Sequence, residues 1–239
     1  MGDVNGDPMA ACDTCVVRNR AICSALDKDE IAVLNALGRR RTVAPGEPLI
    51  WEDDDSLLVA NVIEGVLKLV NSTEDGREQI VGVAYPSDFI GRPFGQKTKA
   101  SVVALTEARV CIFARGDFDR FAREHPGLEH KLLERTLTEL DRTRNWMMLL
   151  GRKNASEKIA TFLLEMADRM AEASCVPDLN PEPRVALPFS RQQIADLLGL
   201  TIETVSRQFT KLKNDGIIDL PSRRDVVIRN RHALAALAG

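Results

Sequence analysis

Four of the five cysteines in this 239-residue chain place the strongest constraint on how it can fold. Cys12, Cys15 and Cys23 lie within twelve residues near the start, and Cys111 lies far downstream. Thiolates are the ligands that soft metals prefer, so this group predicts a metal centre that attaches the N-terminal segment to the domain behind it. An iron–sulfur cluster held by four thiolates fits a close group of cysteines with one remote member.

Three other interpretations of these cysteines are open at this point. Structural zinc usually takes two close ligand pairs, and the chain offers one pair followed by two single cysteines. A disulfide framework is typical of short secreted chains, whereas the first residues here are polar and acidic and do not form a signal peptide. Buried thiols without a metal are a plain alternative for Cys111, because residues 109–113 alternate as in a strand, but a poor one for Cys12 and Cys15. We interpret Cys175 as a spare thiol.

Hydrophobic residues make up 44% of the chain, as in an ordinary soluble globular protein. No run approaches the ~20 apolar residues that cross a bilayer, so we expect a cytoplasmic protein without a membrane partner. The net charge is −3, yet residues 184–239 carry nine lysines and arginines against five aspartates and glutamates. The basic C-terminal end therefore favours a nucleic-acid partner.

Short apolar runs fill residues 40–115 and are separated by turn pairs such as Pro45-Gly46, Glu64-Gly65 and Asp75-Gly76, the last of which is the strongest hairpin signal. The runs cover residues 48–51, 57–63, 66–70, 78–84, 100–105 and 109–113. Many short strands at this spacing predict a compact antiparallel roll or barrel.

Helices are predicted on both sides of the roll. A short helix over residues 27–37 begins with Asp27 as its N-cap and stops before Gly38. Another helix is predicted over residues 155–172. The four prolines in residues 174–188 then predict a loop or linker.

A long helix is predicted over residues 126–151, and its apolar pattern indicates a dimer. Leu133, Leu137, Leu140 and Met147 follow one another at intervals of four, three and seven, the period of a coiled-coil seam. Arg144 takes the place of the next apolar residue, which predicts a marginal and therefore adjustable homodimer. The alternative is a helix whose apolar side faces the core of its own chain.

Residues 190–228 have the pattern of a winged helix-turn-helix. Ser190 and Gln193 form a capping box at the start of a short helix that Gly199 ends. A second helix begins after Thr201 as its N-cap and stops at Gly216. In a helix-turn-helix the second helix enters the major groove. Residues 217–228 follow as two predicted strands around a basic turn.

The second helix carries the candidate base contacts. Its exposed face holds Ile202, Glu203, Ser206 and Arg207, opposite the apolar stripe of Val205, Phe209 and Leu212. Glu203 can accept from cytosine, and Arg207 can donate to both guanine acceptors. Thr201 at the helix start and Arg223 and Arg224 in the wing are further DNA-contact candidates. A simple Glu203–Arg207 ion pair on a solvated face is the alternative.

These motifs, in this order, resemble the Crp/Fnr family of bacterial transcription regulators from Cys12 to about His232. Cys12, Cys15, Cys23 and Cys111 look like the cluster ligands of the oxygen-sensing fumarate and nitrate reduction regulator branch. Residues 203–207, Glu-Thr-Val-Ser-Arg, match the recognition-helix pattern of that branch. Seven residues separate Cys15 from Cys23, which is similar to the alphaproteobacterial variant.

The resemblance implies an α+β fold in four segments: a cysteine-bearing segment (1–26), a β-roll like a cyclic-nucleotide-binding jelly roll (27–125), a dimerisation helix (126–151) and a winged helix-turn-helix (152–239). It implies a [4Fe-4S] cluster that favours the homodimer without oxygen and is converted or lost in air. The expected partners are RNA polymerase and a palindrome in double-stranded DNA resembling TTGAT, four spacer bases, ATCAA. A regulator with structural zinc is the alternative.

Two other functions are not expected. The cyclic-nucleotide branch needs a glutamate shortly after Phe89-Ile90-Gly91 and an Arg-Ser pair downstream, but the chain has Arg92-Pro93 and Thr98-Lys99 there. An iron–sulfur enzyme is a weak interpretation, because there is no Gly-rich phosphate loop. The three histidines, His125, His130 and His232, also lack a ligand spacing or a nucleophile partner.

Overall fold

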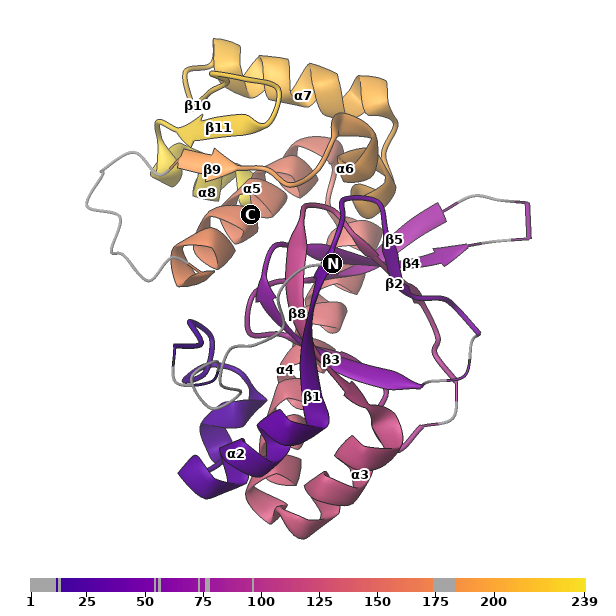
Figure 1. Cartoon of the computed structure of the whole chain (residues 1–239). Helices are drawn as coiled ribbons and strands as arrows, with labels where there is room; N and C mark the ends of the chain where they lie inside the picture. Colours follow the sequence, from indigo (N-terminus) through magenta and orange to yellow (C-terminus); the bar gives the residue numbers. More distant parts are fainter. Residues whose placement is uncertain are drawn as a thin grey trace. The chain divides into compact units, whose positions relative to one another are not determined.

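A computed structural model describes residues 12, 14–53, 55, 57–72, 74–75, 78–95, 97–173 and 184–239, apart from the side chains of 170–173. The chain divides into two compact units (Figure 1). The first comprises Met1–Asn71 and Gly82–Leu140, and the second comprises Ser72–Val81 and Asp141–Gly239. No helix among the described residues is long and apolar enough to cross a membrane.

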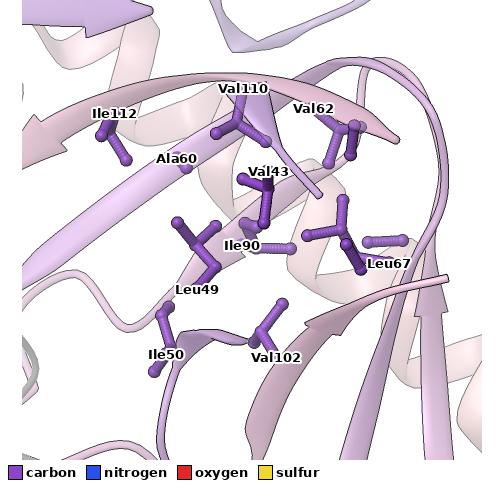
Figure 2. Close-up of a cluster of buried hydrophobic side chains, with 13 residues drawn as sticks. Val43, Leu49, Ile50, Ala60, Val62, Leu67, Ile90, Val102, Val110 and Ile112 are labelled. Carbon is purple, nitrogen blue, oxygen red and sulfur yellow. The ribbon is translucent and has the colours of Figure 1, made fainter. Parts of the chain in front are cut away.

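Two four-stranded sheets form the β-roll. One has the strand order β1-β8-β3-β6 and the other β2-β7-β4-β5. The strands are β1 (Gly38–Val43), β2 (Pro48–Ile50), β3 (Leu58–Glu64), β4 (Leu67–Ser72), β5 (Glu78–Ala84), β6 (Phe89–Gly91), β7 (Ser101–Ala104) and β8 (Ala108–Ala114). Aliphatic side chains from both sheets, including Val43, Leu49, Val62 and Val102, form one core (Figure 2). The predicted roll is confirmed.

The first sheet has a second buried face. Along β8, Val110 and Ile112 point into the roll, so Cys111 and Phe113 face the other way. A 3₁₀ turn, η1 (Ile22–Ala25), the helices α2 (Lys28–Leu37) and α3 (Arg115–Glu124), and the start of the long helix cover this outer face with their side chains. The cysteines therefore lie on the outer face and not in the roll interior.

Most predicted elements are confirmed, but η1, β1, β6, α3 and the C-terminal helix Arg231–Ala238 were not expected. Three consecutive arginines, Arg39 to Arg41, interrupt the apolar alternation that would have indicated strand β1. The strand forms because it pairs with β8. The strand β6 has only three residues. The predicted helix start at Asp27 is confirmed, because its carboxylate accepts from the amide of Glu30 at 2.9 Å.

The second unit contains the predicted winged helix-turn-helix. Its elements are α5 (Ala155–Ala173), β9 (Arg184–Ala186), α6 (Arg191–Leu198), α7 (Ile202–Asn214), β10 (Ile218–Asp219), β11 (Asp225–Ile228) and α8 (Arg231–Ala238). The loop predicted over 174–188 is wrong at its C-terminal end, because β9 pairs with β11 and completes the sheet of the wing. Residues 174–183, and with them Cys175, lie outside the described part of the chain.

Helix α4 (Pro126–Arg152) is the predicted long helix and runs from the first unit into the second. Leu128 and Leu132 near its start are buried in the cluster under the outer face of the sheet. Leu149 near its end is also buried. Between these anchors the helix keeps most of its surface open.

Candidate functional site

The four predicted ligands come together on the outer face of the sheet. Cys12, Cys23 and Cys111 pack against the cluster formed by Ile22, Phe113 and their neighbours. Cys15 packs with Cys111 against a smaller cluster of Val17, Ala21 and Ile63. All four are free thiols of intermediate exposure. A segment at the start of the chain and a strand nearly ninety residues later thus meet at one place.

Electrostatics also identify the four thiols as neighbours. Burial is the main cause that raises the pKa of Cys23 to about 12, and the neighbouring Cys12 and Cys15 contribute to the same rise. Burial and, to a smaller extent, the other three cysteines together raise the pKa of Cys111 to about 12. Such thiols are neutral at pH 7, and a metal would displace their protons on binding.

The donor set suits a soft metal but is not closed around one. Among the described residues, no three cysteine, histidine, aspartate or glutamate side chains are arranged to hold a metal ion. The Cys12 thiol instead donates a hydrogen bond to Asn35 Oδ1 at 3.1 Å. Four sulfur donors are suited to zinc or iron–sulfur chemistry and not to calcium or magnesium. Binding would require Cys12 to leave Asn35.

The cysteine segment contacts one side of α4. Ile22 and Leu26 pack in the same cluster as Leu128 and Leu132. Farther along the helix, the Arg135 guanidinium donates to the backbone carbonyl of Arg20. The cysteine segment and α4 therefore share one apolar cluster and a hydrogen bond.

The predicted seam lies exposed on α4. Leu133 is 55% exposed, Leu137 52%, Leu140 41% and Met147 69%. The alternative of a core-facing stripe is therefore wrong for these positions within the described chain. Arg144 in the seam forms an exposed ion pair with Asp141 on its own helix at 3.2 Å. An uncovered apolar stripe of this kind marks an interaction surface.

The helix-turn-helix is built as its capping residues predict. Ser190 Oγ accepts from the amide of Gln193 at 3.2 Å, and the Gln193 side chain accepts from the Ser190 amide at 2.8 Å. Gly199 adopts a left-handed conformation with φ of 60°, which closes α6 and permits the tight turn. Thr201 then caps α7 by accepting from the amide of Thr204 at 3.2 Å.

The candidate base contacts share the open face of α7. Val205, Phe209 and Leu212 are buried on its inner side. The remaining candidates on this helix, Thr201, Ile202, Glu203, Ser206 and Arg207, are all exposed. In the described part of the chain, Glu203 and Arg207 do not form an ion pair with each other. Both side chains are therefore available to contact DNA.

The wing presents Arg223 and Arg224 at an exposed turn between β10 and β11. The hydroxyl of Ser222 shapes this turn, because it accepts from the amide of Arg224 at 3.1 Å and from that of Asp225 at 3.0 Å. Both guanidinium groups are carried on a turn whose backbone is held in place.

One basic residue at this surface was missed. Arg191, the first residue of α6, lies over Phe209 with its guanidinium carbon 3.4 Å from the ring centroid. Its Nη1 is buried without a hydrogen-bond partner in the described chain, and burial lowers its pKa to about 10. The capping box placed Arg191 at the helix start, but nothing local predicts that it stacks on the second helix.

Comparison with known proteins supplies the family. A model described as the cyclic nucleotide-binding domain matches residues 40–125, and one described as the Crp-like helix-turn-helix domain matches residues 157–237. The chain is 42% identical to the transcriptional activator protein FnrL of Cereibacter sphaeroides, over 95% of this chain and 92% of that protein. It is 44% identical to the nitrogen fixation regulation protein FixK of Bradyrhizobium diazoefficiens, over 87% and 85% of the two chains.

A solved structure agrees with these matches. The structure of FixK2 from Bradyrhizobium japonicum superimposes with a TM-score of 0.76 and 33% sequence identity. The superposition covers 84% of this chain and 98% of that one. The roll, the long helix and the helix-turn-helix therefore occur together in that regulator as they do here.

Proposed function

The chain belongs to the Crp/Fnr family of transcription regulators, which are not enzymes, and on this premise we propose that it is a transcriptional activator of the Fnr/FixK type whose DNA binding responds to oxygen. One observation carries the proposal. The four cysteines converge on the outer face of the roll, at the segment that packs against α4.

Cys12, Cys15, Cys23 and Cys111 would together hold a [4Fe-4S] cluster. When bound, this group would supply an oxygen-labile connection between the N-terminal segment and β8. The four half-buried thiols fit it in number and kind, because neutral sulfur donors in an apolar setting are converted to thiolates by a metal. Transmission of the cluster's state to the dimer and to DNA would depend on the residues of the protein.

Helix α4 would pass the state of the cysteine segment to the dimer. Its inner side contacts Ile22 and Leu26 through Leu128 and Leu132, and its outer side exposes Leu133 next to Leu132. A shift of the inner contacts would therefore turn or bend the seam. A change of ~2 kcal/mol in seam free energy alters dimerisation about thirtyfold, and dimer formation and DNA binding are linked.

A dimer would present two α7 helices to successive major grooves, about one DNA turn apart. The proposed site is a palindrome resembling TTGAT, four spacer bases, ATCAA. Glu203, Ser206 and Arg207 would read base edges, while Arg223 and Arg224 would contact phosphates. As an activator, the protein would act through RNA polymerase.

Arg207→Ala and Arg224→Ala are expected to weaken DNA binding in different ways. Loss of the forked contact at Arg207 should cost ~1 to 3 kcal/mol and relax the preference at one base pair, whereas loss of Arg224 should weaken all sequences alike. Competition binding against a set of single-base operator variants measures both effects. An unchanged sequence preference in Arg207→Ala would remove Arg207 from the base-reading set.

The decisive test of the function is anaerobic purification of the wild-type protein, followed by iron and sulfide assays and exposure to air. We expect a brown protein that bleaches in air and loses its dimer and its affinity for the palindrome together. A colourless protein that carries zinc and binds equally well after exposure to air would support the structural-zinc alternative, which the all-sulfur donor set also permits.

A cyclic nucleotide is not proposed as the ligand of the roll, although the roll matches the domain model of that name. The hydroxyl of Thr98, near the place of the expected Arg-Ser pair, is buried and donates to the backbone carbonyl of Trp51 at 2.5 Å. Equilibrium dialysis with cyclic AMP should find no saturable binding.

A further inference from the structure

Asn61 is a polar residue in an apolar position. It lies in the middle of β3 and is only 2% exposed, and the two residues on each side of it in the strand are buried and hydrophobic. Its Oδ1 has no hydrogen-bond partner in the part of the chain that the structure describes. A buried polar group without a partner is destabilising, so a valine or leucine here would give a more stable strand. Folding stability therefore does not explain the asparagine at this position, which indicates a functional role.

The amide nitrogen of Asn61 indicates what this role is. Asn61 Nδ2 lies 3.8 Å from Cys23 Sγ, within hydrogen-bond range for sulfur. Asn61 is also the cross-strand partner of Cys111. Its side chain thus shares the outer face of the sheet with Cys111 and reaches the thiol of Cys23, two candidate ligands that come from distant parts of the chain.

A positively charged residue lies beside Cys111 on the neighbouring strand opposite to β3. Arg40 in β1 is the cross-strand partner of Cys111 in β8, just as Asn61 in β3 is from the other flank. The positive charge of Arg40 favours the thiolate form of Cys111. The neighbouring Arg39 is in register with Ile112, so it projects from the other face of the sheet.

We propose that Asn61 is a positioning residue for the thiolate centre: it donates a hydrogen bond to the Cys23 sulfur, and Arg40 balances the charge at Cys111. This inference rests on the proposed function, because it assumes that the cysteines hold metal. A donor directed at a thiolate sulfur and a nearby cation both stabilise the charged ligand set. Outer partners of metal ligands typically change metal affinity by about 10–100-fold.

Asn61→Leu separates this role from a structural one, because the two roles predict opposite signs. Without metal, the variant should be as stable as the wild type or more stable, since a buried polar group is replaced by an apolar one. With iron bound, its loss of iron to bathophenanthroline disulfonate under nitrogen should be about tenfold faster. The measurements are thermal unfolding of the metal-free protein and the rate at which the chelator complex forms.

Arg40→Gln and Arg39→Gln form a matched pair on one strand. Arg40→Gln should speed iron loss severalfold, and Arg39→Gln should leave it unchanged. Wild-type iron retention in Asn61→Leu, or a metal-free Asn61→Leu that is less stable than the wild type, would overturn the inference. If the wild-type protein purified without oxygen carries no iron at all, it is the proposed function that fails, so the two failures are distinguishable.

Discussion

Cys23→Ala protein purified without oxygen is expected to hold less than about a tenth of the wild-type iron and sulfide, because a four-thiolate centre does not close on three ligands. The same protein should be mainly monomeric at concentrations where the anaerobic wild type is dimeric. Cys23 is the most informative of the proposed ligands to remove. It lies within η1, and the nearby Ile22 and Leu26 pack in one cluster with Leu128 and Leu132 of α4.

Cys175→Ala is the control for this variant. Cys175 is the one cysteine that the proposed ligand set does not use, so its removal should leave iron, sulfide and dimerisation at wild-type levels. Iron and sulfide are measured colorimetrically on samples handled under nitrogen, and association is measured by sedimentation velocity. Equal iron in Cys23→Ala and Cys175→Ala would exclude Cys23 from the centre.

The fold class could be predicted because alternation and capping are local. The alternating residues 109–113, the N-cap at Asp27 and the capping box at Ser190 each specify an element from a few neighbours in sequence, and each is confirmed. The strands β1 and β9 could not be predicted in this way. Strand β1 forms by pairing with β8 despite its three arginines. Strand β9 forms by pairing with β11 despite the nearby prolines.

The candidate site could be predicted only in part, for a related reason. Residue type and spacing identify the four cysteines, because few other arrangements explain three close thiols and a remote one. The positions of Asn61 and Arg191 depend on tertiary packing. Asn61 reaches Cys23 across 38 positions in the chain, and Arg191 stacks on a different helix. An asparagine in an apolar strand was the available signal, and it is weak by itself.

Leu137→Glu is expected to prevent dimerisation while leaving the fold of the single chain intact. Leu137 is 52% exposed on α4, so a glutamate there removes little buried apolar surface from the monomer and should change its unfolding free energy by no more than ~0.5 kcal/mol. In a dimer the same position would bury two carboxylates in an apolar seam. That should cost ~3 kcal/mol or more, a hundredfold or greater rise in the dimer dissociation constant.

Thr138→Glu is the matched control, because Thr138 is exposed on the same turn of α4 but lies about 100° around the helix from Leu137. It introduces the same charge away from the seam and should remain dimeric without oxygen. Sedimentation velocity and binding to the palindrome, both under nitrogen, compare the two variants with the wild type. Since dimer formation and DNA binding are linked, Leu137→Glu should lose both together. A dimeric Leu137→Glu would place the interface on another surface and remove the exposed stripe of α4 from the path between the cysteines and DNA.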